Sequence, residues 1–151
     1  MQLREIITAS KTCEILGGMT LKPKLGYWVG KLANKLESDV KAYTKAREDL
    51  TKKYSELDKA GRPKTEKQGE GKNQVEVIKF KSDKDEEKFK EDNSTLLDVE
   101  TKLDFQKIKL SLFLQEEEKI PALVYQNLFS FIEDDEEAWE KEQAKKDKSE
   151  K

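Results

Sequence analysis

Hydrophobic residues recur at helical spacing in two stretches of the first 60 residues. The shorter stretch covers residues 2–16, and the glycine pair at 17–18 predicts the end of that helix. Residues 22–59 form a second, much longer amphipathic stretch, in which Pro23 suits the first helical turn. The apolar face of the short stretch consists of Leu3, Ile6, Ile7, Cys13 and Leu16. The pattern therefore predicts a short helix followed by one long helix.

The long helix carries an apolar stripe that repeats every seven residues, and seven-residue spacing is typical of a coiled coil. A helix over residues 22–59 extends about 55 Å at 1.5 Å per residue, which is longer than one small domain covers. Part of the stripe must therefore meet another helix of the chain or a second copy, and the pattern leaves both open. The repeat consists of Val29, Leu36, Tyr43, Leu50 and Leu57, widened by Leu25, Leu32, Val40 and Tyr54.

Two later stretches alternate between apolar and polar residues, which is typical of strands. The first is "QVEVIKF" at 74–80. The second is "LLDVETKLDFQKIKL" at 96–110, where charged residues separate an apolar face made of Leu97, Val99, Leu103 and Phe105. We expect the two to pair in a small sheet with one solvated face, packed on the helices. The sequence leaves the direction of pairing open.

The stretches around these strands predict a helix, a loop, a closing helix and a tail. Ser82 with Asp85 resembles a capping box and predicts a short helix over 83–94, with Phe89 as its main apolar residue. Residues 61–74 contain glycine, proline and charges, which predicts a flexible loop. The almost wholly charged residues 135–151 predict a frayed helix or disordered tail. Pro121 marks the start of a closing helix whose apolar face is Ile120, Val124, Leu128, Phe131 and Ile132.

These elements predict an α+β fold with a single domain over residues 1–134. The long helix packs with the N-terminal helix, a small two- or three-stranded sheet and a C-terminal helix. Only 34 % of the 151 residues are hydrophobic, so we expect a modest core with much solvated surface.

Charge is nearly balanced over the whole chain, with 30 basic and 32 acidic residues, and this argues against nucleic acid and membrane surfaces as partners. The distribution is uneven: residues 1–60 carry 12 basic and 8 acidic groups, while residues 114–151 carry 6 and 12. The acidic end could be plain solvated surface, fold back on the basic long helix, or dock on a basic partner. A basic face with Tyr27, Trp28 and Tyr43 could contact nucleic acid, but four acidic residues on that helix dilute it.

The sequence lacks the side chains on which most catalytic and metal sites depend. It contains no histidine, which removes the commonest general base and the commonest metal ligand. The single cysteine, Cys13, lies on the apolar helix face and is interpreted as a core residue. We therefore expect no enzymatic activity, cofactor, metal or small-molecule substrate. The lone cysteine, the start "MQLREIITAS" without a signal peptide, and the absence of a long apolar run predict a soluble cytoplasmic protein.

The candidate functional residues are those that could form a face for a protein partner or for a second copy of the chain. Trp139 belongs to them because a tryptophan in an acidic tail can serve as a docking motif. The predicted face consists of Tyr27, Trp28, Val29, Leu36, Tyr43, Leu50, Tyr54, Leu57 and Trp139.

Three stretches resemble, in order, a family of small tailed-phage proteins that forms a domain of unknown function. They are "TKAREDLTKKY" (44–54), "LLDVETKLDFQKIKL" (96–110) and "IPALVYQNLFSFIED" (120–134), and the likeness covers roughly residues 1–134. The loop 61–73 and the charged tail depart from the family pattern. The resemblance implies a shared architecture and a viral protein in the cytoplasm of an infected cell, and it brings no catalytic residues.

The sequence and the resemblance together favour a non-enzymatic phage protein that acts by protein–protein interaction, for example on a host factor. A first alternative is a virion accessory or assembly protein that works as a homo-oligomer through the long-helix stripe. A second alternative is a nucleic-acid-binding accessory protein.

Overall fold

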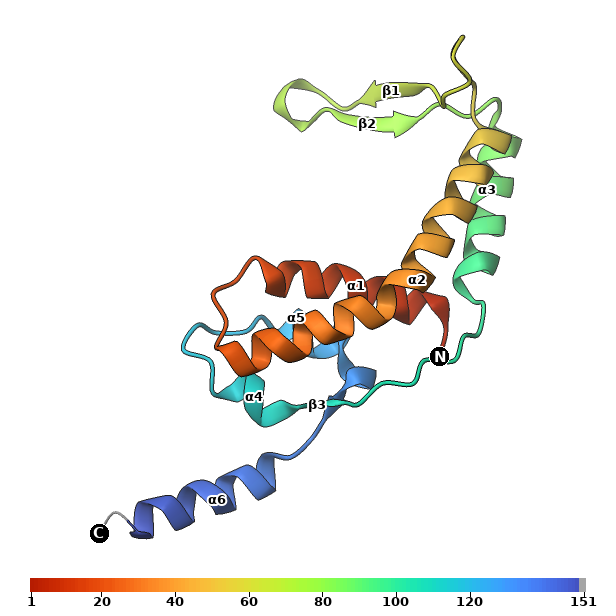
Figure 1. The fold of residues 1–151 in the computed structure, drawn as a ribbon. Coiled ribbons are helices and arrows are strands. Elements are labelled where there is room, and N and C mark those ends of the chain that lie inside the picture. The colour runs from red at the N-terminus through yellow and green to blue at the C-terminus, as the bar shows by residue number, and fades with distance from the viewer. Residues whose placement is uncertain (150–151) are drawn as a thin grey trace. The chain divides into compact units, whose positions relative to one another are not determined.

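Two helices open the chain, as the hydrophobic spacing predicts. In the computed structural model, which describes residues 1–149, α1 spans Leu3–Gly17 and α2 spans Pro23–Tyr54 (Figure 1). α1 ends at the first glycine of the predicted stop. α2 ends five residues before the predicted boundary, because Ser55 and Leu57 leave the helix to form β-bridges with Phe80 and Pro63.

The chain divides into two compact units, where the sequence predicted a single domain. Unit 1 consists of Met1, Glu5–Glu37 and Lys102–Lys151, and unit 2 of Gln2–Arg4 and Ser38–Thr101. The long α2 supplies its first part to unit 1 and its second part to unit 2. Each unit therefore covers its own length of the apolar stripe.

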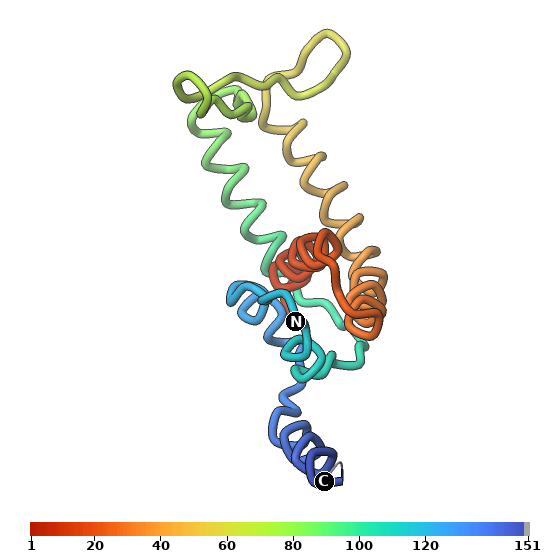
Figure 2. Tube along the Cα trace, turned by 90° about the vertical axis from the view of Figure 1, so that its left-hand side faces the viewer, coloured from red at the N-terminus to blue at the C-terminus, as the bar shows by residue number. Residues whose placement is uncertain are grey.

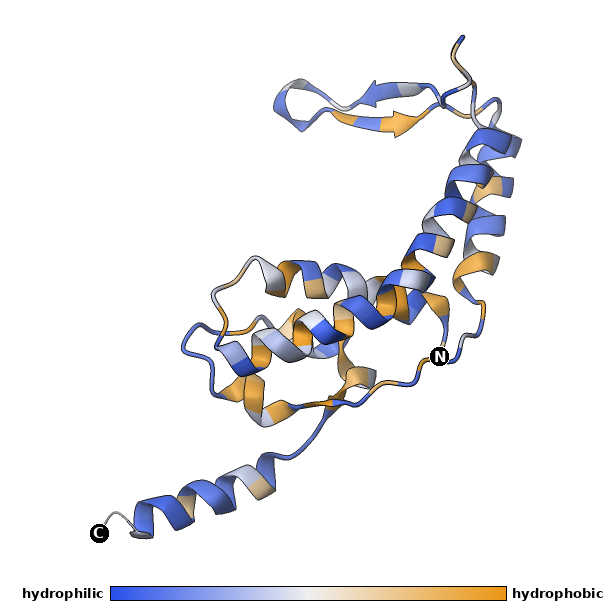
Figure 3. Ribbon diagram, viewed as in Figure 1, coloured by the Kyte–Doolittle hydropathy of each residue, from blue (hydrophilic) through white to orange (hydrophobic). Residues whose placement is uncertain are grey.

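Unit 1 is built from α1, the first part of α2 and several short elements near the C-terminus. These are β3 (Ile108–Lys109), α4 (Leu110–Leu114), α5 (Ala122–Asn127), η2 (Phe129–Phe131) and β4 (Ile132–Glu133). β3 and β4 pair in parallel, and Ile108 lies opposite Ile132. Figure 3 shows apolar residues concentrated in α1, α2 and α4. The fully buried side chains of this core include Ile6, Leu16, Leu25, Leu32, Leu36, Ile108, Phe113, Leu128 and Phe131.

The strand predicted over 96–110 is wrong for most of its length. Leu96 and Leu97 end a helix, and residues 101–107 belong to neither a helix nor a strand. Leu103 and Phe105 are nevertheless half-buried while their neighbours are exposed, and Phe105 packs edge-on against Phe131 at 6.0 Å between ring centroids. The alternation marks a chain segment with one covered face. Within it, Ile108–Lys109 pairs with β4, and Glu100 forms an isolated β-bridge with Gln2.

Unit 2 contains a β-hairpin that the sequence did not predict as such. β1 (Thr65–Gln68) pairs antiparallel with β2 (Val75–Ile78), so the sheet partner of β2 lies within the predicted loop 61–74 and not within 96–110. The four residues of β1 are all exposed and polar, so no hydrophobic alternation marks them. The turn contains the short helix η1 (Gly71–Asn73), and Gly69 has a φ of +102°. A Cβ at Gly69 would lie 2.7 Å from the Asn73 carbonyl oxygen, so only glycine fits.

The second part of α2 runs beside α3 (Asp83–Leu97) in unit 2, as Figures 1 and 2 both show. Two tyrosine hydroxyls of α2 donate hydrogen bonds to α3. Tyr43 reaches the Asn93 side-chain oxygen at 3.2 Å, and Tyr54 reaches the Asp92 carboxylate at 2.5 Å. Phe89 of α3 is buried and packs against Phe80 at 5.2 Å between centroids. Contact with α3 therefore covers the second half of the predicted stripe on α2.

The predicted cap of α3 is confirmed, and it yields a stability prediction. The Asp85 N–H donates to the Ser82 hydroxyl oxygen at 3.2 Å, and the hydroxyl donates to the Asp85 carboxylate at 2.8 Å. Ser82→Ala is expected to destabilise α3 by about 1 kcal/mol, because it removes the acceptor for an N–H at the helix start. Hydrogen exchange of the first-turn amides of α3 measures this loss. Ser94→Ala, in the last turn of the same helix, is the control and should leave those amides unchanged.

The charged C-terminal segment, predicted to be frayed or disordered, forms the helix α6 (Glu136–Ser149). Acidic Glu136 and Glu137 lie in its first turn and Lys146 and Lys148 in its last, which suits the helix dipole. The Asp134 carboxylate accepts the Glu136 N–H at 3.1 Å, and so caps the start of the helix. Local charge placement therefore favours a helix where hydrophobic content alone favours disorder. Across residues 1–149, none of the helices combines the length and the apolar character needed to cross a membrane.

Candidate functional site

Most of the predicted interaction stripe of α2 is covered within the chain. Val29 and Leu36 are buried in unit 1, and Tyr54 is buried in unit 2. Tyr43 and Leu50 are half-buried in unit 2, and Leu57 lies beyond the end of α2 with 42 % of its surface exposed. The seven-residue repeat thus reflects packing inside two successive units. Little of its apolar surface stays exposed for contact with a second copy of the chain.

Tyr27 and Trp28 form an aromatic pair on the first turns of α2. Their rings meet edge to face at 5.5 Å between centroids, and the Lys31 ammonium lies 5.0 Å from the Trp28 ring. Tyr27 is 61 % exposed and Trp28 is half-buried. The pair therefore presents aromatic surface beside a cation, as the sequence allowed.

Trp28 and Trp139, both predicted as interaction residues, line one cleft of about 450 Å³ in unit 1. We call it the tryptophan cleft. Its walls come from the start of α2, from residues 106–115 around β3 and α4, and from α6. Four lysines and two carboxylates also line it: Lys24, Lys107, Lys109, Lys146, Asp135 and Glu142. The structure thus brings basic residues of α2 and residues of the acidic C-terminal segment to one place.

Asp135 links α6 to the wall of the cleft through Ser111. Its carboxylate accepts the Ser111 N–H at 2.8 Å and the Ser111 hydroxyl at 2.5 Å. Burial alone raises the pKa of Asp135, but the two bonds from Ser111, with the charge of Lys109, outweigh it and hold that pKa below its ordinary value. Asp135 is therefore ionised at neutral pH and its oxygens are already engaged.

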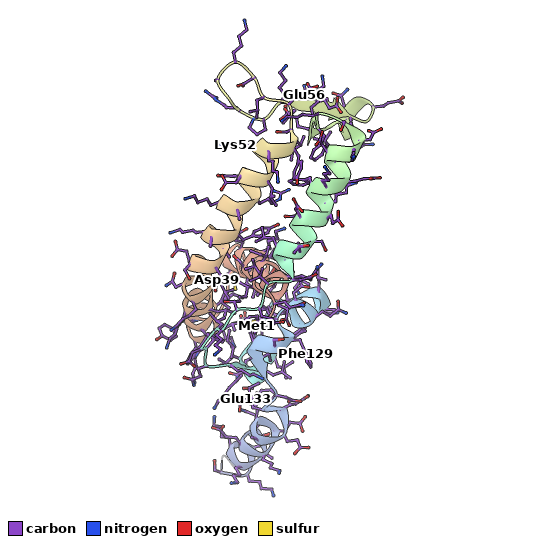
Figure 4. The ribbon with its side chains drawn as sticks, turned by 90° about the vertical axis from the view of Figure 1, so that its right-hand side faces the viewer. Met1, Asp39, Lys52, Glu56, Phe129 and Glu133 are labelled. Carbon is purple, nitrogen blue, oxygen red and sulfur yellow. The ribbon has the colours of Figure 1, made fainter. Side chains whose placement is uncertain are left out.

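Three exposed apolar residues that the sequence did not predict lie on η2, on α5 and on α1 of unit 1. Phe129 is 80 % exposed, Leu123 57 % and Ile15 52 %. We call these three residues the apolar strip; Figure 4 marks Phe129 on the light-blue segment. The sequence contained a signal for Phe129: the predicted closing helix assigns Leu128 and Phe131 to its buried face, which leaves Phe129 without a place in the core.

Two side-chain hydrogen bonds attach α5 and η2 to α1. The Asn127 amide donates to the Thr12 hydroxyl oxygen at 3.1 Å, and the Ser130 hydroxyl donates to the Glu5 carboxylate at 3.2 Å. These two bonds show that α5 and η2 run antiparallel to α1. Ile15 lies one helical turn beyond Thr12, and Leu123 one turn before Asn127, so the two exposed side chains lie at the same end of this contact.

The single cysteine of the sequence lies in the core of unit 1. Cys13 is buried, and desolvation together with the nearby charge of Glu14 raises the pKa of its thiol to about 11. The thiol is therefore protonated at neutral pH. Within residues 1–149, the acidic and cysteine side chains form no cluster of three that could hold a metal ion.

No protein family, curated protein or solved structure matches this chain. The resemblance to phage proteins stays a prediction, and the apolar strip and the tryptophan cleft are the two candidate binding surfaces of unit 1.

Proposed function

We propose that this chain is a protein-binding module that works without catalysis, and that Phe129 anchors it in an apolar pocket of another protein. The observation that carries the proposal is the 80 % exposure of a phenylalanine between two buried core residues, Leu128 and Phe131. Aromatic side chains of this kind dominate the binding energy of protein interfaces.

Burial of the Phe129 side chain in a pocket of the partner favours binding through the hydrophobic effect. Complete burial of a phenylalanine side chain contributes about 1.5–3 kcal/mol relative to leaving it in water. The backbone of η2 is held on both sides, by Asn127 on Thr12 and by Ser130 on Glu5. A side chain on a fixed turn loses less conformational freedom on binding than one on a loose loop, so more of the burial energy appears as affinity.

The coverage of the α2 stripe supports a foreign partner over self-association as the main role. A homo-oligomer built on the stripe needs Val29, Leu36 and Tyr54 at the surface, and all three are buried within their own units. Among the large apolar residues of residues 1–149, Phe129 on the strip is the most exposed, at 80 %, whereas Leu57 is the only exposed residue of the seven-residue repeat, at 42 %. The phage resemblance supplies the expected class of partner, which is a protein of the infected cell or of the phage itself, in the cytoplasm.

The test compares two exposed aromatic residues on different surfaces of unit 1. Phe129→Asp is expected to weaken partner binding about tenfold or more, since a central aromatic anchor contributes about 2 kcal/mol or more. Tyr27→Ser, the matched control, should leave binding unchanged. A tagged chain is used to purify a stoichiometric protein from infected cells, and its affinity for both variants and the wild type is then measured by calorimetry.

Equal affinity of the wild type and Phe129→Asp for the purified protein contradicts the proposal, provided that both chains unfold at the same urea concentration. Sedimentation of the isolated chain tests the alternative, in which the protein works as a homo-oligomer. A dimer that Phe129→Asp dissociates identifies a second copy as the occupant of the apolar strip, and the assembly role then replaces the proposal.

A further inference from the structure

We propose that the tryptophan cleft binds a nucleotide unit, with the base stacked on the indole rings and the phosphate held by lysines. The phosphate-bearing unit is either a free nucleotide or part of a single strand, since both present the same chemistry. This site lies on other elements than the apolar strip and adds an activity to the proposed function.

The charges of the cleft leave a positive surplus inside an acidic chain. The formal net charge of the whole chain is −2, whereas the cleft has four lysines against Asp135 and Glu142. Asp135 is engaged by Ser111 and interacts with Lys109, and Glu142 pairs with Lys146 at 3.5 Å. Lys24 and Lys107 remain, and neither has a salt bridge within residues 1–149. The surplus therefore favours an anion.

The aromatic side chains specify what kind of anion fits. Trp28 and Trp139 come from helices far apart in the sequence, and both reach the cleft. Indole faces stack with any nucleobase, and a basic groove with interleaved aromatic rings is the usual arrangement for single strands. The volume of about 450 Å³ lies within the usual range for small-molecule sites.

The indole N–H of Trp139 has no hydrogen-bond acceptor among the described residues and is closed to solvent. A buried donor without an acceptor is unfavourable, so native proteins keep few of them. A ligand oxygen would satisfy this donor only if the Trp139 side chain turned its N–H toward the cleft that the residue lines.

An acidic peptide is the other class of ligand that lysines attract. Phosphate and carboxylate both suit Lys24 and Lys107, so the charges do not separate the two classes. The two tryptophans do, because an indole ring can stack on the planar ring of a nucleobase, whereas an acidic side chain has no ring to stack. The lining of the cleft therefore fits a nucleotide better than an acidic peptide.

The experiment uses the tryptophans as reporters, because Trp28 and Trp139 are the only two in the chain and both line the cleft. Fluorescence of the full chain is titrated at low salt with a single-stranded thymidine oligonucleotide, with ATP, and with poly-glutamate. We expect saturable quenching by the oligonucleotide or by ATP. Lys107→Glu is expected to weaken it about tenfold, as loss of a charged contact does, and to reduce the salt dependence by about one phosphate contact.

Two further variants keep the result interpretable. Lys24→Glu should act like Lys107→Glu, whereas Lys11→Glu, an exposed lysine of α1 outside the cleft, should bind like the wild type. Quenching by ATP alone assigns free nucleotide, and tighter binding of the strand assigns nucleic acid; both support the site. Quenching by poly-glutamate without either nucleotide ligand overturns the proposal in favour of a peptide. No saturable change with any probe, or an equal loss in Lys11→Glu, also overturns it.

Discussion

Phe131→Ala is expected to lower the free energy of unfolding of unit 1 by about 3–5 kcal/mol, the usual cost of deleting a fully buried phenylalanine ring. Only 2 % of Phe131 is exposed, and its ring packs edge-on against Phe105. The deletion removes this contact and leaves a cavity in the core of unit 1. Urea unfolding followed by tryptophan fluorescence measures the loss, since both tryptophans belong to unit 1.

The matched control for this prediction is two residues away on the same turn. Phe129→Ala deletes the same ring from a side chain that is 80 % exposed, so the unfolding free energy should change by less than about 0.5 kcal/mol. The pair thus isolates burial from residue type. Equal destabilisation by the two changes contradicts the placement of η2, and with it the assignment of Phe129 to the apolar strip.

Asp135→Ala is expected to destabilise unit 1 by about 2 kcal/mol and to release the start of α6. The change leaves the Ser111 N–H and hydroxyl without their acceptor, and Ser111 is buried. Hydrogen bonds to a charged group contribute about 1.5–3 kcal/mol. A shift of tryptophan emission to longer wavelength reports the greater exposure of Trp139. Asp134→Ala, which removes only a cap from the adjacent exposed residue, should cost less than half as much and keep the emission unchanged.

The effect of Asp135→Ala depends on pH in a defined direction. Because the folded state lowers the pKa of Asp135 below the ordinary 3.8, the carboxylate stabilises the fold above the unfolded pKa, at about pH 4 and higher. This contribution is lost as the pH falls through the lower, folded-state pKa. The difference between wild type and Asp135→Ala should therefore be constant from pH 5 to 8 and shrink in acid below about pH 4. A difference that grows in acid contradicts an ionised Asp135.

Helices were the most predictable part of the fold, because periodicity and caps are local properties of the sequence. The ends of α1 at the glycine pair and of α3 at Ser82 follow from single residues whose chemistry the sequence shows. The α+β class is confirmed for the same reason. The two-unit division is not local: it depends on which parts of the chain cover each half of α2, and a continuous stripe looks the same in either case.

The strand predictions failed because hydrophobic alternation and backbone pairing do not always occur in the same segment. Leu103 and Phe105 alternate because one face of their segment is covered, although its backbone forms no ladder. The residues of β1 do form a ladder, but all four are exposed and hydrophilic. Alternation thus indicates which side chains are buried but not which backbone groups form hydrogen bonds. For this reason the sheet partner of β2 was predicted in 96–110 and not in β1.

The candidate surfaces were predictable only in part. Trp28 and Trp139 were named for their residue type, and the structure brings them into one cleft, which no spacing in the sequence indicates. Phe129 was not predicted as a surface residue, although the predicted closing helix leaves it off the buried face of Leu128 and Phe131. Its exposure is decided by the tight turn of η2, which places Leu128 and Phe131 inside and Phe129 outside.

The interrupted sequence of unit 1 sets an order of events at the ribosome. The residues of unit 2 have all emerged once position 101 has left the exit tunnel, whereas the core of unit 1 needs Ile6 and Leu16 to meet Phe113, Leu128 and Phe131. Contacts this far apart in sequence form late, and units fold as their residues become available during synthesis. The apolar faces of α1 and of the first half of α2 consequently remain uncovered until the residues up to Phe131 have been made.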